Sequence, residues 1–231
     1  MNRMAVTPDR APLARLVKRI MLHSGSGHCH VTHGRLLVGW RETPVEQPKP
    51  ARMNRDEFRR WVEEQGGQRF ERIAGEPVAM SPERLGHVRL KYRVWQALDA
   101  ALAEEGLGCE AIGDGATVEI NEDVDYEPDV LVECGDRTSN DALAASSPTI
   151  VVEVLSRGTR GVDTGAKLGD YFSVSSIMHY LICHADRKLV VHHRRDGADY
   201  HTRILHGGTI ELVPPGISID LDAVYQRAGI G

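Results

Sequence analysis

The chain has 231 residues, of which 41% are hydrophobic and 26% charged, and its formal net charge is −5 at pH 7. This balance is ordinary for a globular chain and excludes collagen-like and wholly disordered proteins. No apolar run approaches the roughly 20 residues that span a bilayer, and the start lacks the apolar core of a secretory signal. The four cysteines show no CxxC spacing, so we expect free thiols, a reducing compartment and a cytoplasmic protein.

Charge divides the chain into two parts. Residues 1–52 carry nine basic and three acidic residues, which leaves residues 53–231 with a net charge of −11. The first part shows no sustained periodicity and ends in a proline-rich stretch, so we expect a basic, disordered extension, and Met53 could be the true start. Its cluster of His28, Cys29, His30 and His33 matches no structural zinc spacing. A body as acidic as residues 53–231 is not suited to non-specific phosphate binding.

Residues 53–231 show regular patterns that predict a mixed α/β domain. Asn54 is a plausible N-cap for a first helix, and Ala74-Gly75 joins two strands of a hairpin. Ser81-Pro82 opens a long helix that ends at Gly106. Its buried stripe is expected to be Leu85, Val88, Tyr92, Trp95, Leu98 and Leu102. The remaining predictions are strands at 69–73, 76–80, 109–112, 116–120, 129–133, 149–155, 177–183, 189–194 and 200–205, and helices at 159–172 and from Asp220.

Glu153 stands out because it lies inside the apolar run Thr149-Ile-Val-Val-Glu-Val-Leu155. The β-branched residues of this run predict a central strand that is covered on both faces. An ionised carboxylate in such a strand costs several kcal/mol unless a cation or a strong donor compensates it. The alternative is a glutamate at the sheet rim that is paired with Arg157 or Arg160.

Asp129 follows Pro128 at the entry to a second apolar strand. Proline fits the first residue of a strand, although a Pro-Asp pair alone is also a common turn dipeptide. Together with Glu153 on a neighbouring strand, Asp129 could form a two-carboxylate oxygen site, which suits Mg²⁺ or Mn²⁺.

A lysine follows on the next predicted helix. Asp163, Lys167 and Tyr171 are spaced at i, i+4 and i+8, so they share one helix face. A solvated Asp–Lys pair is the alternative interpretation for Lys167. His87 lies on the long helix, where it is either a surface histidine or part of the same site.

This ordered combination resembles the PD-(D/E)XK nucleases, which have a restriction-endonuclease-like fold, and more specifically the Uma-two family within that superfamily. The resemblance covers roughly residues 53–230. It rests on residues 69–82, His87, 126–130, 152–156, Asp163, Lys167, Tyr171, Tyr180 and Pro215-Gly216. The chain departs from the family pattern at Leu155, where the lysine of E-x-K is expected, and at Tyr180-Leu-Ile-Cys-His184, where the family usually has YW-x-x-D.

The resemblance implies one domain at residues 53–231, with a mixed central sheet flanked by helices and an extra set of antiparallel strands. It assigns Asp129 and Glu153 to metal binding and makes Lys167 the substitute for the missing lysine. A carbonyl, that of Val154, would complete the ligands of Mg²⁺ or Mn²⁺. His87, Glu76, Asp163 and Tyr171 would support the site.

The implied activity is a metal-dependent endonuclease that hydrolyses phosphodiester bonds of nucleic acid, DNA rather than RNA. A homodimer would suit cutting of both strands, and no membrane partner is expected. Arg84, Arg89, Lys91 and Arg93 are candidates for a basic groove. Two alternatives remain open: a catalytically inactive nuclease fold that binds nucleic acid or protein, and a structural protein whose carboxylates are simply paired.

Overall fold

The structure is a computed structural model that describes residues 31–32, 35–36, 51–155 and 164–231. Residues 1–49 and 50–231 form two separate units. In the first unit, β1 (Val31–Thr32) pairs with β2 (Arg35–Leu36) in antiparallel orientation. The predictions made for the rest of the basic extension, including the cluster at residues 28–33, fall outside the described residues.

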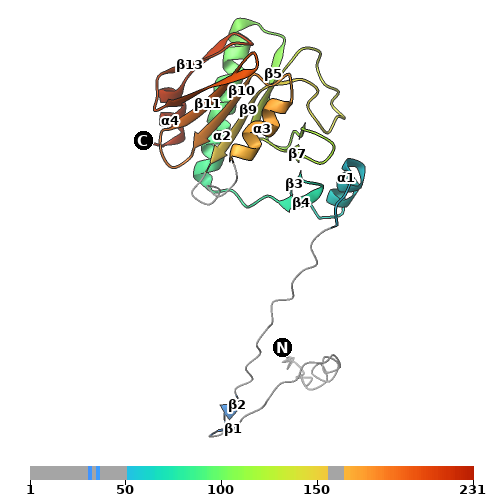
Figure 1. Cartoon of the computed structure of the whole chain (residues 1–231). Coiled ribbons are helices and arrows are strands. Elements are labelled where there is room, and N and C mark those ends of the chain that lie inside the picture. Colours follow the sequence, from blue (N-terminus) through green and yellow to red (C-terminus); the bar gives the residue numbers. More distant parts are fainter. Residues whose placement is uncertain (1–30, 33–34, 37–50, 156–163) are drawn as a thin grey trace, which may run out of the picture. The chain divides into compact units, whose positions relative to one another are not determined.

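A mixed six-stranded sheet forms the centre of the second unit (Figure 1). β9 runs parallel to β10, and the other neighbouring strands of this sheet are antiparallel. The predicted mixed central sheet is therefore confirmed. In spatial order, its strands are β12 (Asp199–Leu205), β11 (Val190–Asp196), β10 (His179–His184), β9 (Pro148–Leu155), β8 (Val130–Cys134) and β5 (Cys109–Gly113).

Helices cover both faces of this sheet, which explains the continuous apolar run of β9. The described helices are α1 (Arg55–Glu63), α2 (Leu85–Glu105), α3 (Thr164–Ser173) and α4 (Leu221–Ala228). α2 and α4 pack on the face that carries Val152 and Val154, together with the hairpin of β13 (Thr209–Leu212) and β14 (Ile217–Asp220). α3 packs on the opposite face, which carries Val151.

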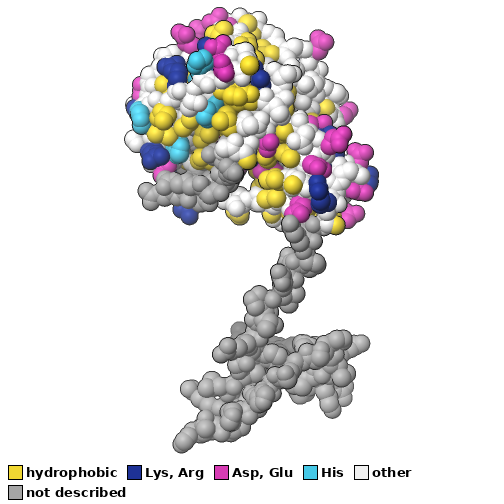
Figure 2. Space-filling view, in the orientation of Figure 1, with side chains coloured by type: hydrophobic (Ala, Val, Ile, Leu, Met, Phe, Trp, Pro, Cys, Tyr) yellow, Lys and Arg dark blue, Asp and Glu magenta, His cyan; other side chains and the backbone are white. Residues whose placement is uncertain are grey.

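The predicted hairpin belongs to a second, antiparallel sheet. Its strands lie in the order β4 (Glu76–Ala79), β3 (Phe70–Ile73), β7 (Asp125–Tyr126) and β6 (Val118–Glu119). The fully buried Arg72 donates to Asp125 at 2.7 Å, and Arg55 of α1 donates to the other oxygen of that carboxylate at 2.8 Å. These contacts join α1 to the sheet, and Figure 2 shows basic and acidic side chains intermixed over this part of the molecule.

Helix caps follow the sequence closely at two of the predicted ends. Asn54 accepts from the backbone of Glu57, and Glu57 accepts from the backbone of Asn54, so the predicted N-cap is part of a capping box. Asp220 caps α4 through the backbone N–H groups of Asp222 and Ala223. α3 is described only from Thr164, so its predicted start at residue 159 lies outside the described residues.

The prediction for α2 was wrong at its start and in its first turns. The helix begins at Leu85 rather than at Pro82, because residues 80–84 stay non-helical and Arg84 takes the extended N-cap conformation. Leu85 and Tyr92 of the predicted buried stripe are 70% and 53% exposed. The residues that α2 buries are His87, Leu90, Lys91, Val94, Leu98 and Leu102. The inward positions of the first turns thus include two polar residues, which no hydrophobic pattern can reveal.

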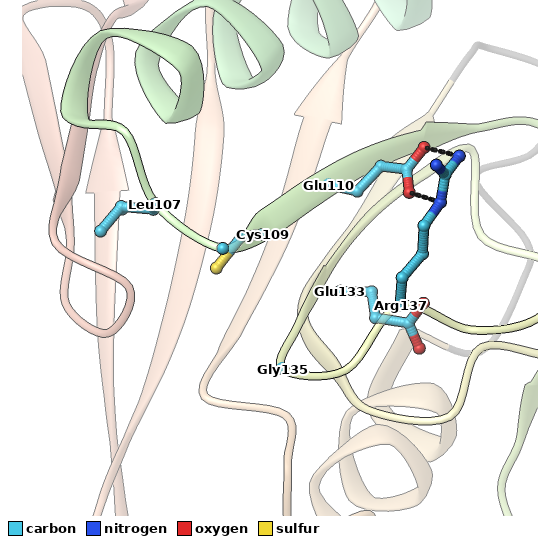
Figure 3. A pocket seen from close by; sticks show the side chains of 7 residues that line it. Leu107, Cys109, Glu110, Glu133, Gly135 and Arg137 are labelled. Atoms are coloured by element: carbon cyan, nitrogen blue, oxygen red, sulfur yellow. Dashed lines mark hydrogen bonds and ion pairs between the residues drawn. The ribbon is translucent and has the colours of Figure 1, made fainter.

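The prediction of free thiols was also wrong for two of the four cysteines. Cys109 and Cys134 form a disulfide, because the register of β5 and β8 makes them direct cross-strand partners. Figure 3 shows Cys109 beside a surface pocket that is spanned by the ion pair of Glu110 and Arg137. Cys183 is a buried free thiol, and Cys29 lies outside the described residues. The disulfide removes two of the thiols on which the inference of a reducing compartment rested.

Among the described residues, none of the helices is both long enough and apolar enough to cross a membrane.

Candidate active site

A pocket of about 210 Å³ lies where the two sheets and the start of α2 meet. The pocket brings together Asp129, Glu153, Val154, Lys167 and His87, which were singled out in the sequence. Its other lining residues are Glu71, Ile73, Val78, Ala79, Met80, Ser81, Pro82, Glu83, Glu127, Leu155 and Tyr180. Five carboxylates therefore face one lysine and one histidine in a single cavity.

Glu153 points from β9 toward α3, on the face that also carries Val151. Its Oε1 accepts from Nζ of Lys167 at 2.9 Å and from the hydroxyl of Tyr171 at 2.7 Å. Burial raises the pKa of Glu153, and the charge of Lys167 opposes that rise. The alternative partners Arg157 and Arg160 lie outside the described residues.

Lys167 is buried between two carboxylates rather than solvated. Its Nζ donates to Glu71 at 2.8 Å as well as to Glu153, and it lies 4.6 Å from the centroid of the Tyr126 ring. Burial lowers the pKa of Lys167, but the charges of Glu153 and Glu71 outweigh burial and raise it above its ordinary value. The ammonium group therefore stays charged at neutral pH.

Asp129 is held just ahead of β8 by two donors. Its Oδ2 accepts from the backbone N–H of Val154 at 2.7 Å, and its Oδ1 lies 3.1 Å from Nε2 of His87. Extending the register of β8 and β9 would place Pro128 opposite Val154. The Asp129 side chain accepts from the Val154 N–H at this end of the ladder, so the Pro-Asp pair precedes β8 and its carboxylate is fixed against β9.

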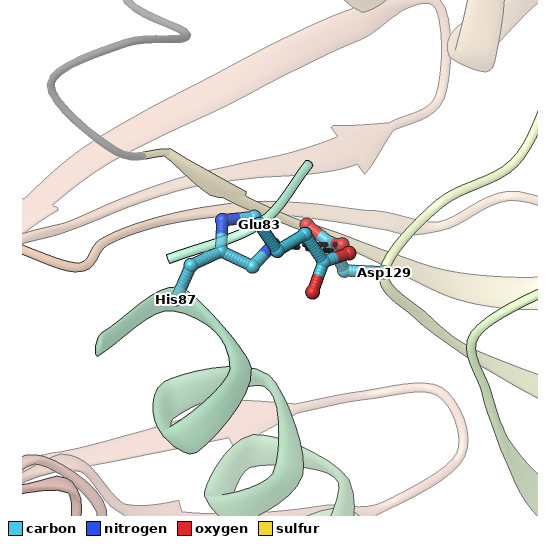
Figure 4. Close-up of side chains that lie close together, drawn as sticks. All are labelled: Glu83, His87 and Asp129. Carbon is cyan, nitrogen blue, oxygen red and sulfur yellow. Dashed lines mark hydrogen bonds and ion pairs between the residues drawn. The ribbon is translucent and has the colours of Figure 1, made fainter. Parts of the chain in front are cut away.

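His87, Glu83 and Asp129 form a cluster that could hold a metal ion, with their ligand atoms within 4.8 Å of one another (Figure 4). Burial lowers the pKa of His87, but its hydrogen bond to Asp129 and the charge of Asp129 raise it above the ordinary value. Lys91 borders the same cluster, with its Nζ 2.5 Å from Glu83 and 3.6 Å from Asp129.

Three carboxylates that line the pocket, Glu71, Glu83 and Glu127, were not assigned to the site from the sequence. Glu71 lies in the segment that carried the family resemblance, but its neighbour Arg72 is the fully buried residue of β3, so strand alternation gives no signal for Glu71. Lys91 was assigned to a basic groove, and that was wrong. It is buried and paired with Glu83 and Asp114, whereas Arg84 and Arg89 are exposed.

The remaining predicted residues lie at different distances from the pocket. Tyr171 does not line the pocket, but its hydroxyl donates a hydrogen bond to Glu153, which does. Glu76 begins β4 opposite Ile73 and is not among the lining residues. Asp163 lies outside the described residues.

The donor set fits a divalent cation. Carboxylate oxygens are the ligands that Mg²⁺ and Mn²⁺ prefer. Lys91 pairs with Glu83 and Arg69 pairs with Glu127, which leaves Glu71, Asp129 and Glu153 around Lys167 and His87. These three carboxylates leave negative charge for a cation to neutralise. Asp129 is the group shared between the predicted pair with Glu153 and the cluster with His87 and Glu83.

Comparisons with known proteins connect this chain to a family. Residues 55–223 match the family Uma2, described as "Putative restriction endonuclease". The uncharacterized protein slr1290 of Synechocystis sp. (strain ATCC 27184 / PCC 6803 / Kazusa) is 26% identical over 180 residues, which cover 76% of this chain and 92% of the relative. The uncharacterized protein sll1609 of the same strain is 27% identical over 138 residues, or 58% of this chain and 77% of the relative.

A solved structure shares the fold. The crystal structure of a "putative nuclease belonging to DUF820" from Anabaena variabilis ATCC 29413 has a TM-score of 0.59 and 12% sequence identity, and covers 75% of this chain and 97% of that one. The family match spans most of residues 53–231, where the motifs of the predicted resemblance also lie. The chain therefore belongs to the Uma2 family of restriction-endonuclease-like proteins.

Proposed function

We propose that the chain is a divalent-metal-dependent endonuclease, and that the pocket around Asp129, Glu153 and Lys167 is its active site. The observation that carries this proposal is the convergence of these three side chains, from the residue before β8, from β9 and from α3, in one cavity rich in carboxylates. The description of the family and that of the structural neighbour both support a nuclease.

Asp129, Glu153 and the carbonyl of Val154 would hold Mg²⁺ or Mn²⁺, and Glu71 is close enough to Lys167 to help balance its charge. When bound, such a cation supplies an acidified water and a counter-charge for phosphoryl oxygens. His87 orients Asp129 through the hydrogen bond at 3.1 Å, and Tyr171 orients Glu153 through the one at 2.7 Å.

We assign Lys167 to charge compensation rather than to proton transfer. Its ammonium group is held at 2.8 and 2.9 Å from two carboxylates, and a lysine in that position keeps its proton. A fixed positive charge offsets the negative charge that develops on phosphoryl oxygens in the transition state. Lys167 thereby takes the role of the lysine that Leu155 replaces in the E-x-K pattern.

DNA is the substrate class we infer, since restriction endonucleases, by which the family is described, act on DNA. We further infer a homodimer, because two active sites are needed to cut both strands in one encounter. A DNA substrate favours a cytoplasmic location, although the disulfide of Cys109 and Cys134 is more typical of an oxidising compartment.

A plasmid-nicking assay tests the proposal. The full chain is incubated with supercoiled plasmid and Mg²⁺ or Mn²⁺, beside Asp129→Asn, Glu153→Gln and Lys167→Met. We expect cation-dependent nicking by the unmodified chain and a loss of at least about 100-fold in each variant, because each removes a cation ligand or the compensating charge.

Glu133→Gln is the matched control. Glu133 is a buried glutamate of the same sheet, but its carboxylate accepts from Thr138, Ser146 and Ser147 and does not line the pocket. Nicking that persists in Glu153→Gln would contradict the proposed site. Plasmid binding without nicking by the unmodified chain would favour the inactive nuclease fold.

A further inference from the structure

Tyr180 is a buried residue of the pocket to which the sequence pattern assigns no chemistry. It lies on β10 as the parallel partner of Val151, and so projects on the same face as Glu153. Its side chain is fully buried and lines the pocket. Its ring packs 5.0 Å from the ring of Tyr171 and 5.7 Å from that of His193, which fixes its direction.

The hydroxyl of Tyr180 differs from those of the other buried tyrosines in the described residues. Tyr126 donates to Asp170 at 2.6 Å, Tyr171 donates to Glu153 at 2.7 Å, and Tyr225 donates to the carbonyl of Leu189 at 2.8 Å. The Tyr180 hydroxyl has no hydrogen-bond partner among the described residues. A buried hydroxyl without a partner destabilises a fold, so its retention calls for a compensating role.

The surroundings of this hydroxyl indicate what it would meet. Burial raises the pKa of Tyr180 far above its ordinary value, and the charges of Glu153 and Glu71 raise it further. The hydroxyl therefore remains a protonated donor beside the carboxylates of the pocket. A hydrated cation held by those carboxylates carries water molecules that accept hydrogen bonds, because Mg²⁺ and Mn²⁺ keep several waters in protein sites.

We propose that Tyr180 is a positioning residue, which donates a hydrogen bond from its hydroxyl to the hydration water of a divalent cation bound at Asp129 and Glu153. The inference rests on the proposed function and adds a residue to it. It explains why a donor is buried without a protein partner in a pocket rich in carboxylates. It also separates Tyr180 from Tyr171, whose hydroxyl is already engaged with Glu153.

The test combines thermal unfolding of the metal-free chain with Mn²⁺ binding measured by calorimetry, for the full chain and for Tyr180→Phe. Without metal, we expect the variant to melt at or above the temperature of the unmodified chain, because the change removes an unpaired buried group and keeps the ring. With Mn²⁺, we expect the affinity to fall roughly tenfold, as for other groups that support metal ligands indirectly.

Tyr225→Phe is the matched control, since Tyr225 is equally buried and its hydroxyl is satisfied by Leu189, away from the pocket. We expect it to lower the melting temperature and to leave Mn²⁺ affinity unchanged. If Tyr180→Phe binds Mn²⁺ as the unmodified chain does, or melts lower by as much as Tyr225→Phe, the assignment of Tyr180 is overturned while the proposed function stands. If the unmodified chain binds no Mn²⁺, the proposed function fails and this inference fails with it.

Discussion

Lys167 is the residue on which the charge balance of the pocket depends. It separates Glu71 and Glu153, which approach it at 2.8 and 2.9 Å from different sheets. Without its ammonium group, both carboxylates would remain buried and no positive charge would lie between them. Breaking a buried ion pair from one side leaves an uncompensated charge, which is more costly than removing both partners.

We therefore predict that Lys167→Met lowers the free energy of unfolding of the metal-free chain by about 3 kcal/mol. Urea unfolding followed by circular dichroism measures the change. Lys188→Met is the control, because Lys188 pairs with Asp222 at the surface, where ion pairs contribute little. Equal stability of Lys167→Met and the unmodified chain would show that the two carboxylates do not depend on this lysine.

The sequence alone could identify site residues that are charged but lie within or beside an apolar run. Glu153 interrupts an apolar run and Asp129 precedes one, so both are visible without a structure. Glu71 is not visible in this way, because it becomes a site residue only through the pairing of β3 with β7 and the approach of α3. The role of Glu71 depends on contacts between segments that are distant in the chain, and local periodicity does not reveal such contacts.

At the scale of elements, β10 and β11 share a buried histidine pair. Nδ1 of His179 lies 2.9 Å from Nε2 of His192, and the two side chains are 0% and 2% exposed. Burial lowers the pKa of His179 to about 4 and that of His192 to about 3, from an ordinary value of 6.5. The folded state therefore keeps both rings neutral under conditions in which the unfolded chain binds protons.

The lowered pKa values of His179 and His192 determine how the stability of the fold changes with pH. The unfolded state binds more protons than the folded state below about pH 6.5, so stability is full above that pH and falls as the pH drops toward 4. We predict that this pair contributes a loss on the order of 3 kcal/mol between pH 7 and pH 5. Urea unfolding at the two pH values measures it.

His192→Leu removes one of the two titrating rings and should reduce that loss by about half. His206→Gln changes an exposed histidine and should keep the full loss. A pH dependence that is the same in His192→Leu as in the unmodified chain would refute the role of the pair.

Most elements could be predicted from periodicity and capping residues, and α2 shows where that reasoning fails. Its buried face carries His87 and Lys91 in the first turns and apolar residues later, while Leu85 and Tyr92 are exposed. The pocket draws polar residues inward at the start of the helix. A helix that borders both the pocket and the hydrophobic core therefore has no continuous apolar stripe from which its buried face could be predicted.

At the scale of the whole molecule, the disulfide between Cys109 and Cys134 fastens the edge strand β5 to β8. Because its cysteines are 25 residues apart, the link restricts a loop of the unfolded chain. Replacing both cysteines by serine should lower the free energy of unfolding by about 3 kcal/mol, measured by urea unfolding in buffer without thiols. Adding a reductant to the unmodified chain should produce the same loss, and an unchanged stability on reduction would show that the cysteines are unpaired in solution.

The division into a basic first part and an acidic body is visible in the composition, and the mixed α/β class is visible in the periodicity. The order of the strands in the sheet, the second sheet and the disulfide are not, because they depend on pairing between segments far apart in the chain. Resemblance to a family supplied the coarse fold, and the match of residues 55–223 confirmed the family.

The proposed active site should hydrolyse phosphodiesters with a divalent cation. The most direct measurement is release of 4-nitrophenolate from bis(4-nitrophenyl) phosphate with Mn²⁺, because that substrate removes any requirement for DNA sequence or structure. We predict release by the unmodified chain and by Glu133→Gln, and its loss in Glu153→Gln. Equal release by Glu153→Gln and the unmodified chain, or no release by a chain that binds Mn²⁺, would contradict the proposed function.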